Sequence, residues 1–296
     1  LHSEAVPSQN KLVVWGLQQY LKRRPLIVCR TAQLTRHKGL FLPDDPAQRM
    51  GVMHELRGVM RDMTRQHNGS FFLADYLDER DLGADWGDFF PLPEFGKSST
   101  QLIVEWATWD EFMQALRVRS KKQHKNVRHN TRYAQDMGLT ITFHEPHNPP
   151  PVEAVVPLIM SYGAKYHAGF TVPDITQTIQ ALARLAAENY VWITAELDGK
   201  IVACEVLLFD EQTRVSRPIL YGRDYDVPYV YFYLAYEDIR YAIEELHARI
   251  MIYDTDAYDF KQRIGFVDDP RHHLVFDPGS RLERGLAALL MRFMND

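Results

Sequence analysis

The stretch YVWITAELDGKIVACEVLLF, residues 190–209, restricts the fold more than any other part of the chain. Two apolar runs are separated there by Asp198, Gly199 and Lys200. An Asp-Gly pair between apolar runs is a strong signal for a β-hairpin. The stretch therefore predicts two neighbouring antiparallel strands, 190–197 and 201–209.

Helices and strands are expected to alternate around this hairpin. Two helices precede it, and a third strand, a long helix, a strand, a short helix around Lys261 and a further strand follow it. A last helix is expected over residues 281–294. The two helices before the hairpin are expected at residues 152–167 and 174–188, and the central long helix at 229–246. The three strands after the hairpin are expected at residues 217–224, 249–254 and 272–277. The order ααβββαβαβ predicts a mixed α/β sheet.

The first half of the chain is expected to form a second α/β domain. Its strands are predicted at residues 25–29, 39–43, 70–77, 101–107 and 139–145, and its helices at 46–63 and 109–137. Asp45 caps the first of these helices, and Thr108 and Glu111 form a capping box at the second. The proline run in PHNPPP can continue neither a helix nor a strand. It predicts a boundary between a domain of residues 1–146 and a domain of residues 147–296.

One segment is strongly basic on an otherwise acidic chain. Residues 117–132, RVRSKKQHKNVRHNTR, hold seven Lys or Arg, two His and no acidic residue. Because the net charge of the chain is -5 and this segment contributes +7, the remaining residues carry -12. The chain therefore has no general cationic field, and binding of an anionic partner is expected to be local.

On the expected helix 109–137 the cations fall on one face. Arg117, Lys121, His124, Arg128 and Arg132 lie within an arc of about 80°. Such a face suits the phosphates of a tRNA acceptor stem or of a phosphorylated acceptor, because Lys and Arg bind phosphate whatever the base sequence. The alternative is a solvated helix face with ion pairs to the acidic remainder of the chain.

Three stretches carry a resemblance to a known family: VWITAELDGKIVACEVLLF, YGRDYDVPYVYFYLAYEDIRYAIEEL and IMIYDTDAYDFKQRIGF. Together with the element order they resemble the GNAT acyltransferase fold. Within it they resemble the Fem-type branch of tRNA-dependent aminoacyltransferases and Fem-like acetyltransferases. The basic helix also resembles the arginine-rich helix of that branch. The resemblance covers residues 100–266 and implies two tandem GNAT-like domains, the first of them divergent.

The start of the central helix bears on the acyl donor. An acetyl-CoA-dependent GNAT enzyme has a Gly-rich turn there, whose backbone N–H groups hold the pyrophosphate. Here the segment is GRDYDVPYVYFY, in which Pro228 lacks an N–H group and bulky neighbours prevent close approach. The resemblance therefore implies aminoacyl-tRNA as co-substrate, with acyl-CoA as the alternative, and no bound cofactor.

The resemblance also implies a catalytic role for Lys261 in YDFKQRIGF. In the family this lysine is implicated in holding the carbonyl oxygen that becomes negative when an amine attacks. Tyr253, Tyr258 and Asp254 lie around the end of the preceding strand and are candidates for moving protons between the amine and the leaving group. The alternatives are a surface lysine at 261 and helix capping by Asp254 and Asp256.

Tyr221 and Arg223 are further candidates, at the corresponding end of the third strand. An arginine there can hold a phosphate or a carboxylate through two hydrogen bonds. No metal site is predicted, because His272 and His273 are neighbours on an expected strand and face opposite sides of it.

The composition favours a cytoplasmic protein. No apolar run approaches the roughly 20 residues that a membrane span needs, and the N-terminal residues lack the long apolar core of a signal peptide. Cys29 and Cys204 lie far apart in apolar strands, which favours buried, reduced thiols over a disulfide.

These observations predict an acyltransferase that moves an activated acyl group to an amine, expected to be a small molecule, or to a related nucleophile. Aminoacyl-tRNA is the expected donor, and direct attack without a covalent enzyme intermediate is the expected route. One rival is an acyl-CoA-dependent N-acyltransferase. A second rival is a non-catalytic GNAT-like module that binds an anionic partner.

Overall fold

The computed structural model describes residues 11–29, 42–69, 71–77, 86–87, 90–92, 99–165, 171–185, 189–253, 257–269, 273–277 and 285. The chain divides into two compact units. Unit 1 comprises residues 1–98 and 269–296, and unit 2 comprises residues 99–268.

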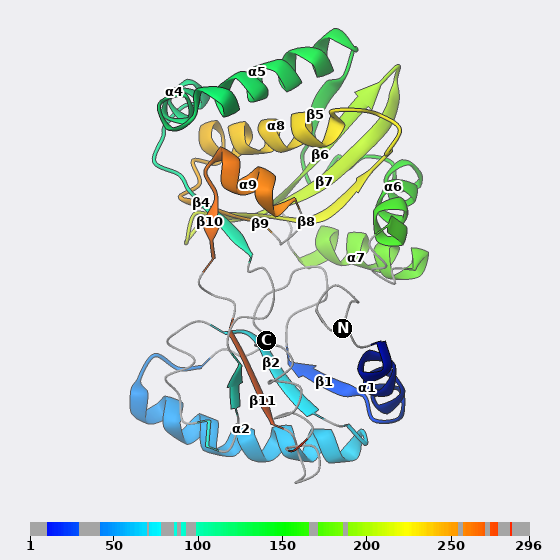
Figure 1. The fold of residues 1–296 in the computed structure, drawn as a ribbon, viewed down its shortest axis with the longest axis vertical. Helices are drawn as coiled ribbons and strands as arrows, with labels where there is room; N and C mark the ends of the chain where they lie inside the picture. Colours follow the sequence, from blue (N-terminus) through cyan, green and yellow to red (C-terminus); the bar gives the residue numbers. More distant parts are fainter. Residues whose placement is uncertain are drawn as a thin grey trace. The chain divides into compact units, whose positions relative to one another are not determined.

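Unit 1 is built on a mixed sheet of four strands in the order β1-β2-β11-β3 (Figure 1). Its elements are α1 (Lys11–Arg23), β1 (Leu26–Cys29), α2 (Pro46–Gln66), β2 (Phe71–Leu77), β3 (Phe90–Leu92) and β11 (His273–Asp277). Helix α2 begins as predicted, since the Asp45 side chain accepts a hydrogen bond from the Gln48 N–H group at 2.8 Å. Met53 and Met60 of α2 share a buried core with Phe72 of β2.

Unit 2 is built on a sheet of seven strands in the order β10-β4-β9-β8-β7-β6-β5. Its first elements are β4 (Thr100–Ile103), α4 (Trp109–Arg119), α5 (Lys121–Asp136), β5 (Thr140–His144), α6 (Val152–Lys165) and α7 (Val172–Leu185). Its later elements are β6 (Tyr190–Leu197), β7 (Lys200–Asp210), β8 (Val215–Arg223), α8 (Val230–Glu244), β9 (Ile250–Tyr253), α9 (Tyr258–Ile264) and β10 (Val267–Asp268). Strands β8 and β9 are parallel, and the other recorded pairs in this sheet are antiparallel.

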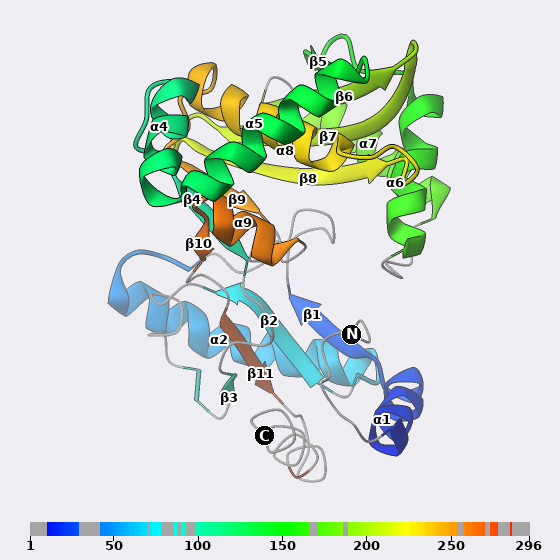
Figure 2. The same ribbon diagram turned by 45° about the horizontal axis from the view of Figure 1, so that its top comes forward.

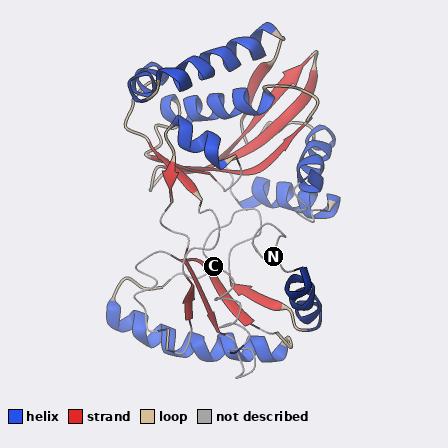
Figure 3. Cartoon of the chain, in the orientation of Figure 1, coloured by secondary structure: helices blue, strands red, loops and turns tan. Residues whose placement is uncertain are grey.

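Helices cover both faces of this sheet (Figures 2 and 3). Helix α6 packs on one face, against β7 and β8, and α7 packs beside it. Helix α8 packs on the other face against β6, β7 and β8, and α5 packs against α8. Two clusters of buried side chains lie on the α8 side of the sheet. One joins α4 and the later part of α8 to β4 and β9, and the other joins the first part of α8 to β6 and β7.

The predicted hairpin is confirmed. Asp198 and Gly199 have φ angles of 52° and 73°, so the turn between β6 and β7 uses the left-handed region at both positions. Thr194 and Cys204 are paired across the two strands. Both cysteines are free, and Cys204 is fully buried as predicted, whereas Cys29 is only partly buried.

The predicted helix 109–137 is wrong in one respect, because it is two helices. It begins as expected, with the Thr108 hydroxyl accepting a hydrogen bond from the Glu111 N–H group at 3.2 Å. At Ser120 the backbone becomes extended, with φ -156° and ψ 102°. The Ser120 hydroxyl then accepts from the Gln123 N–H group and caps α5.

Three strands lie in sheets other than the expected ones. The strand predicted at 139–145, in the first domain, forms as β5 and pairs with β6 in unit 2. The strand predicted at 101–107 forms as β4 and pairs with β9 and β10 in unit 2. The strand predicted at 272–277 forms as β11 and pairs with β2 and β3 in unit 1. The compact units therefore differ from the division expected at residues 146 and 147, which falls between β5 and α6 inside unit 2. The helix expected at 281–294 lies outside the described residues apart from Gly285.

The predicted fold class, a mixed α/β architecture, is confirmed in both sheets. Within unit 2 the order from α6 to α9 is the predicted one, with a three-strand meander between two helices and the central helix α8. Among the described helices, none has the length and apolarity that crossing a bilayer requires.

Candidate active site

Strands β8 and β9 part within unit 2. They pair only where Val215 and Ser216 face Ile250 and Met251. Beyond these pairs β8 continues to Arg223, along β7, and β9 continues along β4. The side chains of both strands and of the helices that follow them, α8 and α9, converge where the strands separate, which is a common place for a ligand site in such sheets.

Helix α9 places Lys261 in the protein interior. The helix begins after Ala257, which has a left-handed backbone, and ends at Gly265 with φ 124°, a conformation that favours glycine. The Lys261 side chain is only 1% exposed. Its Nζ atom lies 5.1 Å from the centroid of the Tyr253 ring, a cation–π contact. The alternative of a surface lysine is therefore wrong, and the structure brings Lys261 and Tyr253 together.

Tyr253 lies near two carboxyl groups that were not predicted as site residues from the sequence. Its hydroxyl donates a hydrogen bond to Oδ2 of Asp238, on α8. Asp238 also shares a hydrogen bond with the side chain of Glu205, on β7. Asp238 is fully buried and Glu205 is 5% exposed. Burial raises the pKa of Asp238 to about 7, although its two hydrogen bonds act in the opposite direction.

Burial also raises the pKa of Tyr253 well above its ordinary value, and the nearby charges of Asp238 and Glu205 raise it further. The tyrosine therefore stays protonated and can donate to Asp238. The sequence did hold a signal for the two acids. Glu205 interrupts the apolar run IVACEVLLF, and Asp238 shares a helix face with Leu234, so each acid stands at a position expected in the core.

Tyr221 and Arg223 lie on β8 near the same cluster. Tyr221 is paired with Glu205 across β7 and β8, so both side chains point to the α8 face of the sheet. The Tyr221 ring meets the ring of Tyr231, on α8, edge to face at 5.7 Å. The Arg223 guanidinium stacks over the Tyr225 ring at 4.4 Å and over the Tyr231 ring at 5.5 Å. Stacking fixes Arg223 at the end of the strand, beside the polar cluster.

The remaining candidates for proton transfer are placed elsewhere. The Tyr258 hydroxyl donates to Oδ1 of Asp268, on β10, and so has a different partner from the Tyr253 hydroxyl. Asp254 lies outside the described residues, as does Asp256.

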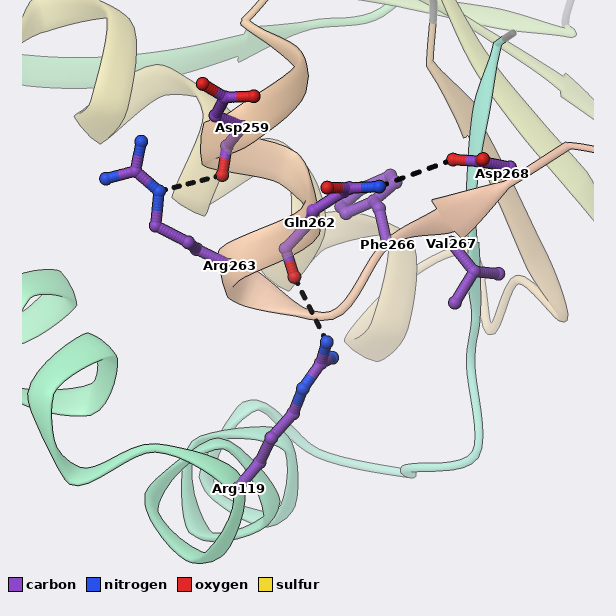
Figure 4. Close-up of a pocket in the computed structure, with 7 residues that line it drawn as sticks. All are labelled: Arg119, Asp259, Gln262, Arg263, Phe266, Val267 and Asp268. Carbon is purple, nitrogen blue, oxygen red and sulfur yellow. Dashed lines mark hydrogen bonds between the residues drawn. The ribbon is translucent and has the colours of Figure 1, made fainter. Parts of the chain in front are cut away.

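An open pocket of about 750 Å³ lies against α9 (Figure 4). It is lined by Arg119, Asp259, Gln262, Arg263, Phe266, Val267 and Asp268. Arg119, at the end of α4, donates to the Gln262 carbonyl at 3.1 Å, and the Gln262 side chain donates to Asp268 at 3.5 Å. Neither Lys261 nor a residue of α5 lines this pocket, so it is separate from the polar cluster.

The cations of the basic segment divide between α4 and α5. Arg117 is exposed near the end of α4, before the break at Ser120. On α5, Lys121, Lys125, Arg128 and Arg132 recur at spacings of four, three and four, so they form one exposed row, which we call the cationic stripe. The opposite face of α5 is buried through Val127 and Ala134.

Two contacts define the surroundings of this stripe. Asn130, on the inner side of α5, donates to the Tyr236 hydroxyl of α8 at 3.2 Å. Arg132 forms an exposed ion pair with Asp136 at 3.5 Å. The helix is therefore held to α8 by its inner face, and the stripe points away from the sheet. Among the described residues, no group of three or more His, Cys, Asp or Glu side chains is arranged to hold a metal ion.

Comparisons with known proteins bear on the same region. Residues 121–262 match a family model described as an acetyltransferase (GNAT) domain. No curated protein matches the sequence.

Several solved structures are similar. A conserved protein of unknown function from Bacteroides thetaiotaomicron has 13% identity and a TM-score of 0.51, over 76% of this chain and 74% of that chain. The C-terminal domain of a putative lysylphosphatidylglycerol synthetase from Agrobacterium fabrum has 14% identity and a TM-score of 0.48, over 83% and 77%. A tandem GNAT protein from the clavulanic acid biosynthesis pathway has 12% identity and a TM-score of 0.46, over 79% and 71%.

The matched region begins at the first residue of α5 and ends one residue after Lys261. It thus includes the cationic stripe, the parted strands β8 and β9, and the polar cluster between them. Residues 121–262 are therefore similar to an acetyltransferase (GNAT) domain.

Proposed function

We propose that unit 2 transfers an activated acyl group to an amine, with Lys261 at the reacting carbonyl. The observation that carries this proposal is the burial of Lys261 over Tyr253, beside the separated ends of β8 and β9. Removing an ammonium group from water costs several kcal/mol, and proteins keep such groups where they serve binding or chemistry. A fixed cation beside a carbonyl stabilises the oxyanion that forms when an amine attacks.

The reaction needs no covalent enzyme intermediate. The amine nitrogen forms a bond to the carbonyl carbon, and the bond from that carbon to the leaving oxygen or sulfur then breaks. The attacking amine loses a proton and the leaving group gains one, so a group that accepts and returns a proton is required. Tyr253, whose ring centroid lies 5.1 Å from the Lys261 Nζ atom, is the first candidate, while Tyr258 and Asp254 remain proposals for the same task.

Aminoacyl-tRNA is the proposed donor, as in the Fem-type branch that the sequence resembles, and a cytoplasmic setting follows from that donor. Two features support it. The cationic stripe and Arg117 present phosphate-binding side chains, and Arg223 is held beside the polar cluster. The start of α8 offers no glycine turn: Tyr229 precedes the helix in a left-handed conformation without a side-chain cap. The proposed acceptor is a small-molecule amine.

Acyl-CoA is the second candidate donor. It is favoured by the match to a domain described as an acetyltransferase. The two donors differ in what a basic surface contributes. A tRNA stem spans several phosphates along a helix, whereas CoA presents its phosphates at one place.

A donor assay separates the candidates. The purified protein is incubated with a panel of amines and either charged tRNA carrying radiolabelled amino acids or radiolabelled acyl-CoA. Loss of label from tRNA, with label appearing on an amine, is the expected result. Consumption of acyl-CoA alone would select the second donor. Consumption of neither would leave a module that binds an anionic partner and would end the catalytic proposal.

Lys261→Met tests the role of the lysine. Methionine keeps most of the buried volume and removes the charge, so the protein is expected to stay folded. Loss of one oxyanion-stabilising group should lower the transfer rate by roughly 100-fold or more. Lys200→Met, at the exposed first residue of β7, is the matched control and should transfer at the wild-type rate. A folded Lys261→Met variant with full turnover would contradict the assignment.

A further inference from the structure

The carboxyl pair formed by Asp238 and Glu205 is a second unusual feature of the site. The two groups come from different elements, α8 and β7, and meet in the interior of unit 2. Oδ1 of Asp238 is buried, and no N–H or O–H group among the described residues donates a hydrogen bond to it. The contact between the Asp238 and Glu205 side chains therefore brings two carboxyl groups together. A hydrogen bond between two carboxyl groups exists only when one of them carries a proton.

Electrostatic repulsion also favours one proton on the pair of carboxyl groups. Two ionised carboxylates in contact inside a protein repel each other strongly, so such pairs share one proton. Burial favours the neutral form as well, and it is the largest cause of the raised pKa of Asp238. The pair therefore carries one negative charge near neutral pH, and it can take up a second proton there.

The groups that face the pair come from every element around it. Tyr253 of β9 donates to Asp238, and Tyr221 of β8 is paired with Glu205. Tyr231 of α8 influences the pKa of Tyr253, and Lys261 of α9 lies over the Tyr253 ring. Tyr253 is thus the one described residue that contacts both Asp238 and Lys261 in these interactions.

We propose that Asp238 and Glu205 hold one proton between them and serve, through the Tyr253 hydroxyl, as the proton store of the acyl-transfer site. This inference rests on the proposed function. The attacking amine gives its proton to the Tyr253 oxygen, and Tyr253 passes its own proton to Asp238. The C–N bond forms and the bond to the leaving group breaks. The leaving oxygen or sulfur then takes a proton back along the same path, so the enzyme returns to its starting state without an added reactant.

A purely structural role fits the pair less well. Replacing a buried polar pair by apolar residues of similar size is often neutral or stabilising, so the pair is weak evidence for stability on its own. Asp238 and Glu205 do not contact the reacting atoms in this scheme. They act through Tyr253 and are positioning residues, and their test needs a readout that packing alone does not change.

The first arm of the test measures stability and needs no donor. The free energy of unfolding of the wild type and of Asp238→Asn is measured across pH. An asparagine can still accept from Tyr253 and donate to Glu205, so the variant is expected to fold. The folded pKa of Asp238 is raised, which means that its contribution to stability is complete below about pH 4 and is lost as the pH rises to about 7. The stability of the wild type relative to the variant should fall over that range.

The second arm measures transfer with whichever donor the wild type consumes. Asp238→Asn and Tyr253→Phe should each lower kcat by roughly 100-fold with little change in KM. The wild-type rate should rise toward neutral pH, because the pair becomes able to accept a proton. This rising limb of the pH–rate profile should disappear in Asp238→Asn. Glu205→Gln should shift the limb, because it removes the shared proton. Glu245→Gln, an exposed acid after the end of α8, is the control and should match the wild type.

The outcomes separate the claims. A stability difference that does not change with pH would overturn the shared proton. A pH limb that survives in Asp238→Asn would overturn the role in transfer. If the wild type consumes neither donor, the proposed function fails and the role in transfer fails with it, while the stability arm still decides whether Asp238 holds a proton in the folded protein.

Discussion

Gly222 allows strand β8 of unit 2 to pack directly against the backbone of helix α6. It lies on β8, one position from Tyr221, and faces α6. A Cβ atom at this position would lie 2.3 Å from the Ile159 nitrogen and 2.4 Å from the Leu158 carbonyl carbon, both of which are backbone atoms. Backbone cannot move aside as a flexible side chain can. The strand and the helix therefore pack this closely only because residue 222 has no side chain.

Gly222→Ala should destabilise unit 2 by roughly 3 kcal/mol, the upper range for overpacking in a core. Urea denaturation measures the loss. Gly51→Ala is the contrasting variant, because nothing lies within 4 Å of a Cβ atom there and the position is inside α2. It should be neutral or stabilising by up to about 1 kcal/mol. Equal effects of the two substitutions would show that the close approach of β8 to α6 is not the cause.

The sequence predicted part of the site. Lys261 could be proposed because the segment around it resembles the Fem-type branch, and Tyr253, Tyr221 and Arg223 because each stands near the end of an expected strand. Asp238 and Glu205 could not be placed together, since they are 33 positions apart and only the packing of α8 on the sheet joins them. A lone acid in an apolar run signals a buried polar group, but it does not name the partner.

Helix α5 shows what periodicity predicts and what it misses. A period of 3.6 residues predicted cations on one face, and Lys121, Arg128 and Arg132 are exposed there while Val127 and Ala134 are buried on the other face. The break before α5 was not predicted, because the apolar pattern continues through Ser120. A serine inside a helical pattern is also a good cap. The break removes Arg117 from the helix that carries the other four cations.

The cationic stripe makes a prediction of its own. Arg128→Ala should weaken tRNA binding and reduce the dependence of log Kd on log salt by about one unit, as expected for the loss of one phosphate contact. Arg184→Ala is the matched control, because Arg184 is exposed on α7, on the other face of the sheet. Titrations at several salt concentrations measure both. Unchanged binding in Arg128→Ala, or an equal effect of Arg184→Ala, would contradict binding by the stripe.

At the scale of the whole molecule, the sequence predicted elements better than their partners. All five strands expected in the second half form, and the Asp198–Gly199 turn determines the pairing of β6 with β7. Pairing between distant segments has no local signal. Strand β4 pairs with β9, about 150 positions later, and β11 pairs with β2, about 200 positions earlier. A proline run looked like a boundary because local sequence cannot show that β5 pairs with β6.

The pairing of β4 in unit 2 and of β11 in unit 1 predicts which fragments of the chain fold. Residues 99–268 contain all seven strands of the unit 2 sheet and should give one cooperative unfolding transition and a dispersed NMR spectrum. Residues 147–296 lack β4, β5, α4 and α5, so one edge of β9 is unpaired and the outer face of α8 is exposed. That fragment also contains β11 without its partners β2 and β3. It should aggregate or remain poorly folded, because unpaired strand edges and exposed apolar surface favour association. If residues 147–296 fold cooperatively and residues 99–268 do not, β4 and the two helices before β5 are dispensable to this sheet.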